Sequence, residues 1–324
     1  MQARILSPTP TNLRRLAAAL RRGELVAMPT ETVYGLAAHA LDPRACRAIF
    51  TAKGRPAKDP LIVHVLDLAH AEQLAVFNPA ARRLARRFWP GPLTLVLPKQ
   101  PCVPDVVTSG GGTVAVRAPA HPLARRLLRL AGIPLAAPSA NLFGYISPTE
   151  AAHVADGLGR RINHVLDGGA CAVGVESTIL DLTNPAKPRI LRPGVVTAAA
   201  LAKCLGRPVG AAPRKSGPGR LLAPGMMARH YSPRTPLILK NPRGRLPQGV
   251  GRIFLRKPAG ETGDNIYWLS ERGALAEAAR NLYRVLRAAD QGGHRQIQVE
   301  PLPADAGGLA AALNDRLKRA AARG

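Results

Sequence analysis

The chain has 324 residues, of which 46% are hydrophobic and 20% are charged, as expected for a globular protein large enough for two domains. Its formal net charge is +26, from 46 Lys and Arg against 20 Asp and Glu, and this charge favours a polyanionic partner such as a nucleic acid. A composition rich in Ala, Arg, Gly and Pro can produce the same charge without selection for binding. Aromatic residues make up only 4%, so stacking platforms for single-stranded bases are not evident.

The four cysteines are scattered, and none forms a C-x-x-C pair. This pattern argues against a zinc site or a disulfide framework, and it favours a reducing compartment such as the cytoplasm. Arginines at 14, 15, 21 and 22 interrupt the apolar residues near the N-terminus, which therefore do not form a secretory signal. Because no apolar run reaches about 18 residues, we expect no membrane-spanning segment.

The first elements lead to a group of polar residues. Residues 3–6 are expected to form a strand, and Thr11 is expected to cap a helix that ends at Gly23. An apolar run at 25–28 follows and ends at Pro29. Because polar residues come directly after this proline, the run predicts a strand that delivers them to its carboxyl end, where open α/β sheets usually bind ligands.

A cluster of basic residues follows the next helix, which Asp42 and the proline after it are expected to begin. The end of this helix brings Lys53, Arg55 and Lys58 to one end of the layer. These cations repel one another unless something negative lies between them, so they favour a phosphate-bearing ligand. The alternative is that they only complement the dipole at the C-terminus of the helix.

Several polar residues also have plain structural explanations. Thr30 and Thr32 can be ordinary strand residues, and His64, within an apolar run, can be a buried core histidine. Glycines at 110–112 could let backbone N–H groups approach a phosphate, although such triplets more often form hairpin turns. Isolated Ser and Thr residues commonly serve in turns and caps. Residue chemistry alone therefore supports an anion site and goes no further.

Short strands alternate with helices up to residue 205, which predicts an α/β domain over residues 1–205. The further elements expected in it are helices capped by Asp67, Asn78 and Thr149, a helix at 122–130, and strands at 93–97, 114–117, 135–137, 165–166, 175–182 and 189–191.

Residues 206–236 are rich in Gly, Pro, Arg and Lys and lack periodicity, so they are predicted to link two domains. A passive tether is the simplest interpretation, but Arg229, His230 and Tyr231 are unusual in a spacer. Residues 237–324 are predicted to form a small βα sandwich. Its expected elements are strands at 237–239, 252–255, 266–269 and 297–299, and amphipathic helices around 275–286 and 309–317.

The order of motifs along the chain closely resembles that of the YrdC-like family, the threonylcarbamoyl-AMP synthases, in its long two-domain form. No single motif is specific, but their ordered series is. The motifs are residues 29–36 (PTETVYGL), 53–56 (KGRP), 60–64 (PLIVH), 89–94 (WPGPLT), 114–117 (VAVR), 137–141 (APSAN), 147–149 (SPT), 174–179 (GVESTI), 191–194 (LRPG), 223–226 (APGM) and 230–233 (HYSP).

The resemblance implies a strongly twisted mixed sheet with a deep positive cleft, and a linker that folds back over the nucleotide site. It implies a nucleotidyltransferase that converts L-threonine, bicarbonate or CO2, and ATP with Mg²⁺ into threonylcarbamoyl-AMP and pyrophosphate. Downstream threonylcarbamoyltransferase proteins would use this product to modify the adenosine beside the anticodon of tRNA.

Site residues follow from motif position. Lys53 and Arg55 are expected to act in catalysis by neutralising the triphosphate, and Arg117 is expected to pair with the carboxylate of threonine. No strong general base and no metal-ligating residue is assigned. The residues expected to bind ATP are Lys53, Arg55, Lys58, Thr113, Ser139, Asn141, Ser147, Arg192 and Tyr231. Those expected to bind threonine are Thr30, His64, Arg117, Ala137 through its backbone, and Ser177.

Some positions depart from the family pattern. Asp59 stands where the family often has Asn, Leu142 and Phe143 replace a more polar pair, and Ala223 replaces a usual Ser. The Asn314-Asp315-Arg316 cluster resembles the closing motif of the family, although a solvated helix face is the expectation we favour there.

Two other functions fit part of the pattern. A non-catalytic RNA-binding module would explain the net charge, but it would have no need for Arg117, Ser177 and the basic cluster together. A carbamoyltransferase of the hydrogenase-maturation type shares a YrdC-like domain. It would also carry acylphosphatase-like and Cys-rich zinc modules, which are not found in this sequence.

Overall fold

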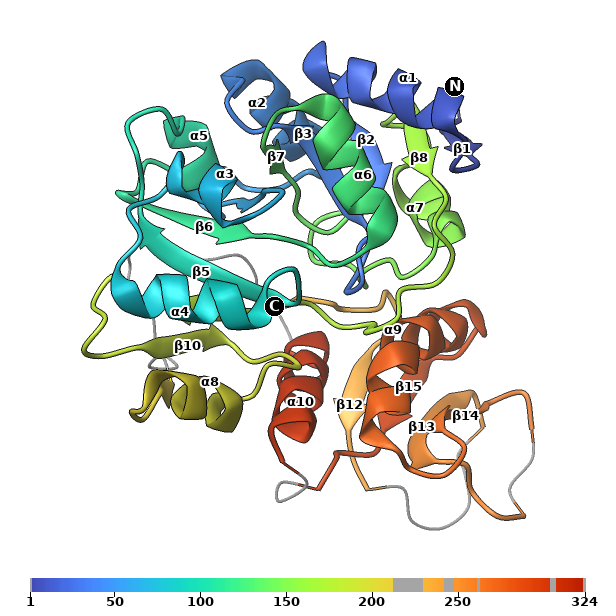
Figure 1. The fold of residues 1–324 in the computed structure, drawn as a ribbon. Coiled ribbons are helices and arrows are strands. Elements are labelled where there is room, and N and C mark those ends of the chain that lie inside the picture. Colours follow the sequence, from blue (N-terminus) through green and yellow to red (C-terminus); the bar gives the residue numbers. More distant parts are fainter. Residues whose placement is uncertain (1, 212–229, 242–247, 261–262, 304–306, 323–324) are drawn as a thin grey trace.

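The computed structural model describes residues 2–211, 230–241, 248–260, 263–303 and 307–322. Within these residues the chain forms a large sheet in its N-terminal part and a small sheet in its C-terminal part, each with helices packed on it (Figure 1). The predicted α/β class, with a twisted mixed sheet and a smaller second domain, is confirmed. The exact domain boundaries stay a prediction. The folding of the linker over the nucleotide site also stays a prediction, because residues 212–229 lie outside the described residues.

The larger sheet is mixed: β4 pairs parallel with β6, whereas β5 pairs antiparallel with β6. In the described part of the chain its order is β1-β8-β2-β3-β7-β4-β6-β5-β9-β10-β11. The last of these strands lies within the predicted linker. The strands are β1 (Arg4–Leu6), β2 (Val26–Met28), β3 (Gly35–His39), β4 (Ile62–His64), β5 (Leu93–Pro98), β6 (Thr113–Arg117), β7 (Leu135–Ala136), β8 (His164–Leu166), β9 (Thr178–Asp181), β10 (Arg189–Arg192) and β11 (Gly210–Ala211).

Helices bury two apolar cores against this sheet. α1 and α6 pack side by side and enclose one core with β2 and β7, while the other helices contribute to a larger core (Figure 1). The helices are α1 (Pro10–Arg21), α2 (Pro43–Lys53), α3 (Leu68–Glu72), α4 (Pro79–Phe88), α5 (Asp105–Thr108), α6 (Pro122–Ala131), α7 (Ala151–Leu158) and α8 (Ala198–Leu205).

Local capping signals placed most helix starts correctly. Two predicted caps were wrong. α1 begins at Pro10 with Thr9 as its cap instead of Thr11, because a proline suits the first helical position. α7 begins after Glu150, and the hydroxyl of Thr149 lies 3.4 Å from Nδ1 of His153 instead of capping the helix. The side chains of the remaining three predicted caps each accept a first-turn backbone N–H: Asp42, Asp67 and Asn78.

The small sheet is parallel, in the order β12-β15-β13-β14. Its strands are β12 (Leu237–Leu239), β13 (Val250–Arg256), β14 (Ile266–Ser270) and β15 (Gln296–Val299), and its helices are α9 (Leu275–Gln291) and α10 (Gly308–Ala320). In the portion of the chain that is described, no helix combines the length and the apolar character needed to cross a membrane.

The two domains share an apolar core. Val33, Ile146 and Val175 of the first domain pack with the buried residues of α9 and α10. Gly174 allows this close approach, since a Cβ there would lie 2.4 Å from Cα of Arg280, and its φ of +80° also disfavours other residues. The loop before β9 is therefore held directly against α9.

Candidate active site

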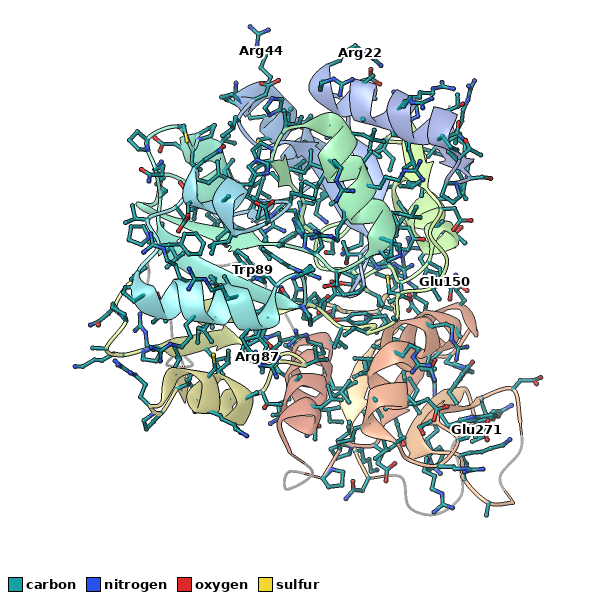
Figure 2. All side chains as sticks on the ribbon, in the orientation of Figure 1. Arg22, Arg44, Arg87, Trp89, Glu150 and Glu271 are labelled. Carbon is teal, nitrogen blue, oxygen red and sulfur yellow. The ribbon has the colours of Figure 1, made fainter. Side chains whose placement is uncertain are left out.

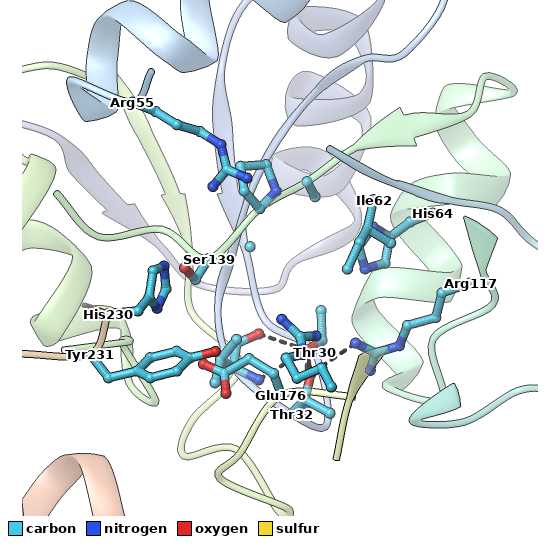
Figure 3. Close-up of a pocket in the computed structure, with 15 residues that line it drawn as sticks. Thr30, Thr32, Arg55, Ile62, His64, Arg117, Ser139, Glu176, His230 and Tyr231 are labelled. Atoms are coloured by element: carbon cyan, nitrogen blue, oxygen red, sulfur yellow. Dashed lines mark hydrogen bonds between the residues drawn. The ribbon is translucent and has the colours of Figure 1, made fainter. Parts of the chain in front are cut away.

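A pocket opens where the loop after β2, the strands β4 and β6, and the loop after β7 meet His230 and Tyr231 (Figure 3). It contains about 500 Å³ of unfilled space, part of which is open to solvent. Its lining residues are Thr30, Thr32, Val33, Gly35, Arg55, Ile62, His64, Arg117, Ala137, Pro138, Ser139, Glu176, Arg192, His230 and Tyr231.

Arg117, at the end of β6, defines one end of the pocket. Its Nη2 lies 2.7 Å from Oε1 of Glu31, and its Nη1 donates a hydrogen bond of 3.0 Å to the hydroxyl of Thr32. Burial alone would raise the pKa of Glu31, but the charge and hydrogen bonding of Arg117 outweigh it and hold that pKa below its usual value. A ligand carboxylate that binds Arg117 must therefore share the guanidinium with Glu31.

His64 lies beside Arg117, because the two residues are register partners in β4 and β6. Burial and the neighbouring Arg117 charge lower the pKa of His64 to about 3, so the imidazole is neutral near pH 7. Its Nδ1 is buried and has no hydrogen-bond partner among the described residues. His64 is thus a buried residue that also lines the pocket, with a neutral imidazole.

Thr30 serves the turn after β2, as the structural explanation of isolated threonines predicts. Its hydroxyl donates to the carbonyl of Val33 at 2.6 Å and accepts the backbone N–H groups of Thr32 and Val33. The same residue lines the pocket, so the turn and the binding surface are built by one side chain. Ala137 follows β7 and also lines the pocket.

The basic cluster that follows α2 is divided by the fold. Arg55 lines the pocket and pairs with Asp59 at 3.0 Å, and its guanidinium also donates to the carbonyls of Asp59 and Pro60. Lys58 is exposed and does not line the pocket. Asp59, which departs from the family pattern, thus offsets the charge of Arg55.

Lys53 is buried behind the pocket wall. Its ammonium donates to the backbone carbonyls of Ser139 and Asn141, both at 2.5 Å. Burial, and secondly the charge of Arg55, lower the pKa of Lys53 well below its usual value. In this arrangement Lys53 fixes the loop after β7, on which Ser139 faces the pocket.

Arg192 brings a second guanidinium to the Arg55 end. It lies in β10, and it donates to the carbonyl and to the hydroxyl of Ser177, each at 3.2 Å. Ser177 is fully buried and its hydroxyl also bonds with Thr94 at 2.8 Å, so Ser177 holds Arg192 from behind.

The structure brings together eight of the predicted site residues as pocket lining: Thr30, Arg55, His64, Arg117, Ala137, Ser139, Arg192 and Tyr231. It does not place the other six in the lining: Lys53, Lys58, Thr113, Asn141, Ser147 and Ser177. Thr113 is half-buried at the start of β6, and the amide of Asn141 bonds to the carbonyls of Leu142 and Tyr145. Their roles stay predictions.

Two acidic residues of the site were not assigned from the sequence. Glu31 pairs with Arg117, and Glu176 lines the pocket beside Arg192. Both belong to motifs that carried the resemblance, so motif membership was the available signal. The expectation of a solvated face at 314–316 was wrong for Arg316, which is completely buried because it pairs with Glu176 at 3.0 Å.

This fold and pocket define a two-domain α/β protein with a polar pocket lined by three arginines, Arg55, Arg117 and Arg192. Residues 18–194 match the family model described as Telomere recombination, and residues 196–322 match the model described as Threonylcarbamoyl-AMP synthase, C-terminal domain. The chain belongs to the threonylcarbamoyl-AMP synthase family, as its motifs predicted.

Two relatives are similar over nearly their whole length. The threonylcarbamoyl-AMP synthase of Pyrococcus abyssi is 42% identical, over 95% of this chain and 93% of that one. That of Bacillus subtilis is 41% identical, over 98% of this chain and 94% of that one. The crystal structure of P. abyssi Sua5 complexed with L-threonine has a TM-score of 0.90 and 40% identity, and covers 98% of each chain.

Proposed function

We propose that this protein is a nucleotidyltransferase that makes threonylcarbamoyl-AMP and pyrophosphate from L-threonine, bicarbonate or CO2, and ATP. The observation that carries this proposal is a single pocket with two separate cationic ends. Arg117, beside the neutral His64, forms one end (Figure 3), and Arg55 with the nearby Arg192 forms the other. The carboxylate of an amino acid and the phosphates of a nucleoside triphosphate are both anionic, so each needs a cationic end of the pocket.

The reaction consists of two bond-forming steps. The amine of threonine attacks the carbon of CO2 and loses a proton, which gives a carbamate. A carbamate oxygen then attacks the α-phosphorus of ATP, and the bond from that phosphorus to the leaving pyrophosphate breaks. Both steps depend on holding the reacting groups close and in line.

The residues of the pocket suit a mechanism of positioning and charge neutralisation. Arg117 would bind the carboxylate of threonine, and His64 would line the same end of the pocket without adding a charge. Arg55 and Arg192 would neutralise the phosphates, where negative charge develops during attack. Tyr231, whose buried hydroxyl has no hydrogen-bond partner in the described residues, would meet the nucleotide.

Mg²⁺ is proposed to enter with ATP. The described residues contain no group of three or more His, Cys, Asp or Glu side chains that could hold a metal ion. Of the two carboxylates near the Arg55 end, Asp59 pairs with Arg55, and Glu176 accepts hydrogen bonds from three side chains of the protein. These residues do not fit a protein-held metal, so the ion would be carried by the phosphates alone.

The proposal extends to tRNA and to the proteins that transfer the threonylcarbamoyl group to it. The net charge of +26 supports contact with a polyanion. The arginines labelled in Figure 2 lie on different elements, Arg22 after α1, Arg44 on α2 and Arg87 on α4, so charge alone does not select one face. A cytoplasmic reaction is proposed from the four cysteines, which are all free.

Release of pyrophosphate tests the proposal. The protein is incubated with ATP, Mg²⁺ and bicarbonate, with and without L-threonine. We expect release only when threonine and bicarbonate are both present. Equal release without threonine would reject the synthase, and ATP-independent binding of RNA as the sole activity would favour a non-catalytic module.

A further inference from the structure

Glu176 is a buried carboxylate in the wall of the pocket, close to the end that carries Arg192. It precedes β9 in the first domain. The hydroxyl of Ser147, also in the first domain, donates a hydrogen bond of 2.7 Å to its Oε1. A single hydroxyl would leave most of this buried charge unpaired, which would be costly.

The second domain supplies the remaining partners. Tyr283 of α9 donates its hydroxyl to the carboxylate, at 3.0 Å from Oε1 and 2.8 Å from Oε2. Nε of Arg316, in α10, donates to Oε2 at 3.0 Å. Both side chains are fully buried, although they lie on helices whose other faces are solvated. The charge of a pocket residue is thus balanced across the domain interface.

The guanidinium of Arg316 makes two further contacts close to the pocket. Its Nη1 donates to the carbonyl of Pro193, directly after Arg192, at 2.7 Å. Its central carbon lies 5.5 Å from the centre of the Tyr231 ring, within the range of a cation–π contact. One side chain of the second domain therefore contacts Glu176 and Tyr231, which line the pocket, and the residue that follows Arg192.

The surroundings of the Glu176 carboxyl favour its charged form. Burial opposes this charge, but Arg316 and then Arg192 stabilise it more strongly and lower the pKa of Glu176 to about 2. An anion in this wall would repel a phosphate that approaches the same end of the pocket. Without Arg316, Glu176 would have Arg192 as its nearest other cation, and it would compete with phosphate for that guanidinium.

We propose that Arg316 is a positioning residue through which the second domain prepares the nucleotide end of the pocket. It holds the Glu176 carboxylate and neutralises it, so that Arg192 stays available to an anionic ligand. This inference rests on the proposed function for the identity of that ligand, ATP. It assigns the second domain a direct electrostatic role in nucleotide affinity, in addition to packing against the first domain.

The test compares Arg316→Gln with Lys318→Gln in the full chain. Lys318 lies exposed on the same helix, so its substitution removes the same charge from the surface only. ATP and threonine are each titrated by calorimetry. We expect Arg316→Gln to weaken ATP binding about 10-fold or more and threonine binding much less, while Lys318→Gln changes neither.

Removing the charge that Arg316 balances should reverse the effect. The double variant Glu176→Gln/Arg316→Gln is expected to bind ATP within about threefold of Glu176→Gln alone, because the repelling carboxylate is gone in both. A loss that depended only on packing would persist in the double variant. Unchanged ATP affinity in a folded Arg316→Gln, or no recovery in the double variant, would overturn the proposal.

If Arg316→Gln does not fold, a double variant that binds ATP more than about threefold more weakly than Glu176→Gln overturns the proposal. Binding of ATP is measured without turnover, so the two hypotheses can fail separately. Wild-type protein that releases pyrophosphate but tolerates Arg316→Gln without loss of ATP affinity would overturn only this inference. If the wild-type protein shows no threonine-dependent release of pyrophosphate, but Arg316→Gln still binds ATP more weakly than the wild type, only the proposed reaction is overturned.

Discussion

Substitution of Arg117 by Gln should separate its role in binding from its role in stability. The side chain of Arg117 is 4% exposed and that of its partner Glu31 is 10% exposed. Loss of a charge-assisted hydrogen bond to the carboxylate of threonine costs roughly 1.5–3 kcal/mol, which weakens binding about 10- to 150-fold. The same substitution leaves Glu31 buried without its cation, at a cost of about 3–5 kcal/mol in the free energy of unfolding.

The double variant Glu31→Gln/Arg117→Gln is the matched control. It removes the orphaned charge, so most of the lost stability should return while threonine binding stays weak. Glu31→Gln alone should tighten threonine binding, because the competing carboxylate is neutral. Calorimetric titration of threonine and urea unfolding of each variant give the two quantities. Unchanged threonine affinity in Arg117→Gln, or equal destabilisation in the single and double variants, would refute this reasoning.

Three further predictions concern Tyr231, two histidines and the domain interface. Tyr231→Phe should weaken ATP binding about 2- to 10-fold in calorimetry, which is the effect of one hydrogen bond, and should leave threonine binding unchanged. Unchanged ATP binding would show that the Tyr231 hydroxyl does not contact the nucleotide. Burial, aided by nearby cations, lowers the pKa values of His64 and His230 to about 3. Below pH 6.5 the unfolded chain therefore binds protons that the folded chain does not, so the midpoint of urea unfolding should fall as the pH decreases from 6.5 towards 3. The fall should be less steep in His230→Asn. Equal dependence of the midpoint on pH in the wild type and in His230→Asn would contradict this. Gly174→Ala should lower the free energy of unfolding by about 1–3 kcal/mol, because its Cβ would meet the backbone of Arg280; wild-type stability in thermal unfolding would show that the interface tolerates it.

Local signals in the sequence were sufficient for most of the fold. Asp42, Asp67 and Asn78 marked helix starts because an N-cap acts within one turn. The apolar runs that end in polar residues marked strands whose ends lie at the pocket. The cap of α1 was predicted wrongly at Thr11, because Pro10 takes the first helical position and makes Thr9 the cap.

The site was only partly predictable, because it depends on contacts that no local pattern sets. Arg117 and Arg192 line one pocket because the strand order of the sheet brings β6 and β10 near each other, with β5 and β9 between them. Motif resemblance supplied these residues, whereas residue chemistry alone supported only an anion site. The same resemblance did not distinguish Arg55, which faces the pocket, from Lys53, which supports its wall.

Arg316 illustrates the limit most clearly. An arginine on an amphipathic helix is usually solvated, and its burial becomes favourable only where a partner offsets the charge. That partner, Glu176, is 140 residues away along the chain. The interface between the domains therefore had to be known before the role of this residue could be inferred.

Direct detection of the product tests the central claim. The protein is incubated with ATP, Mg²⁺, L-threonine and bicarbonate that carries either ¹²C or ¹³C, and the mixture is analysed by mass spectrometry. We predict an adenylate with the mass of threonylcarbamoyl-AMP that becomes heavier with ¹³C-bicarbonate and is absent when threonine is omitted. An adenylate whose mass does not respond to the bicarbonate label, or the absence of any adenylate from protein that binds ATP and threonine, would contradict the account.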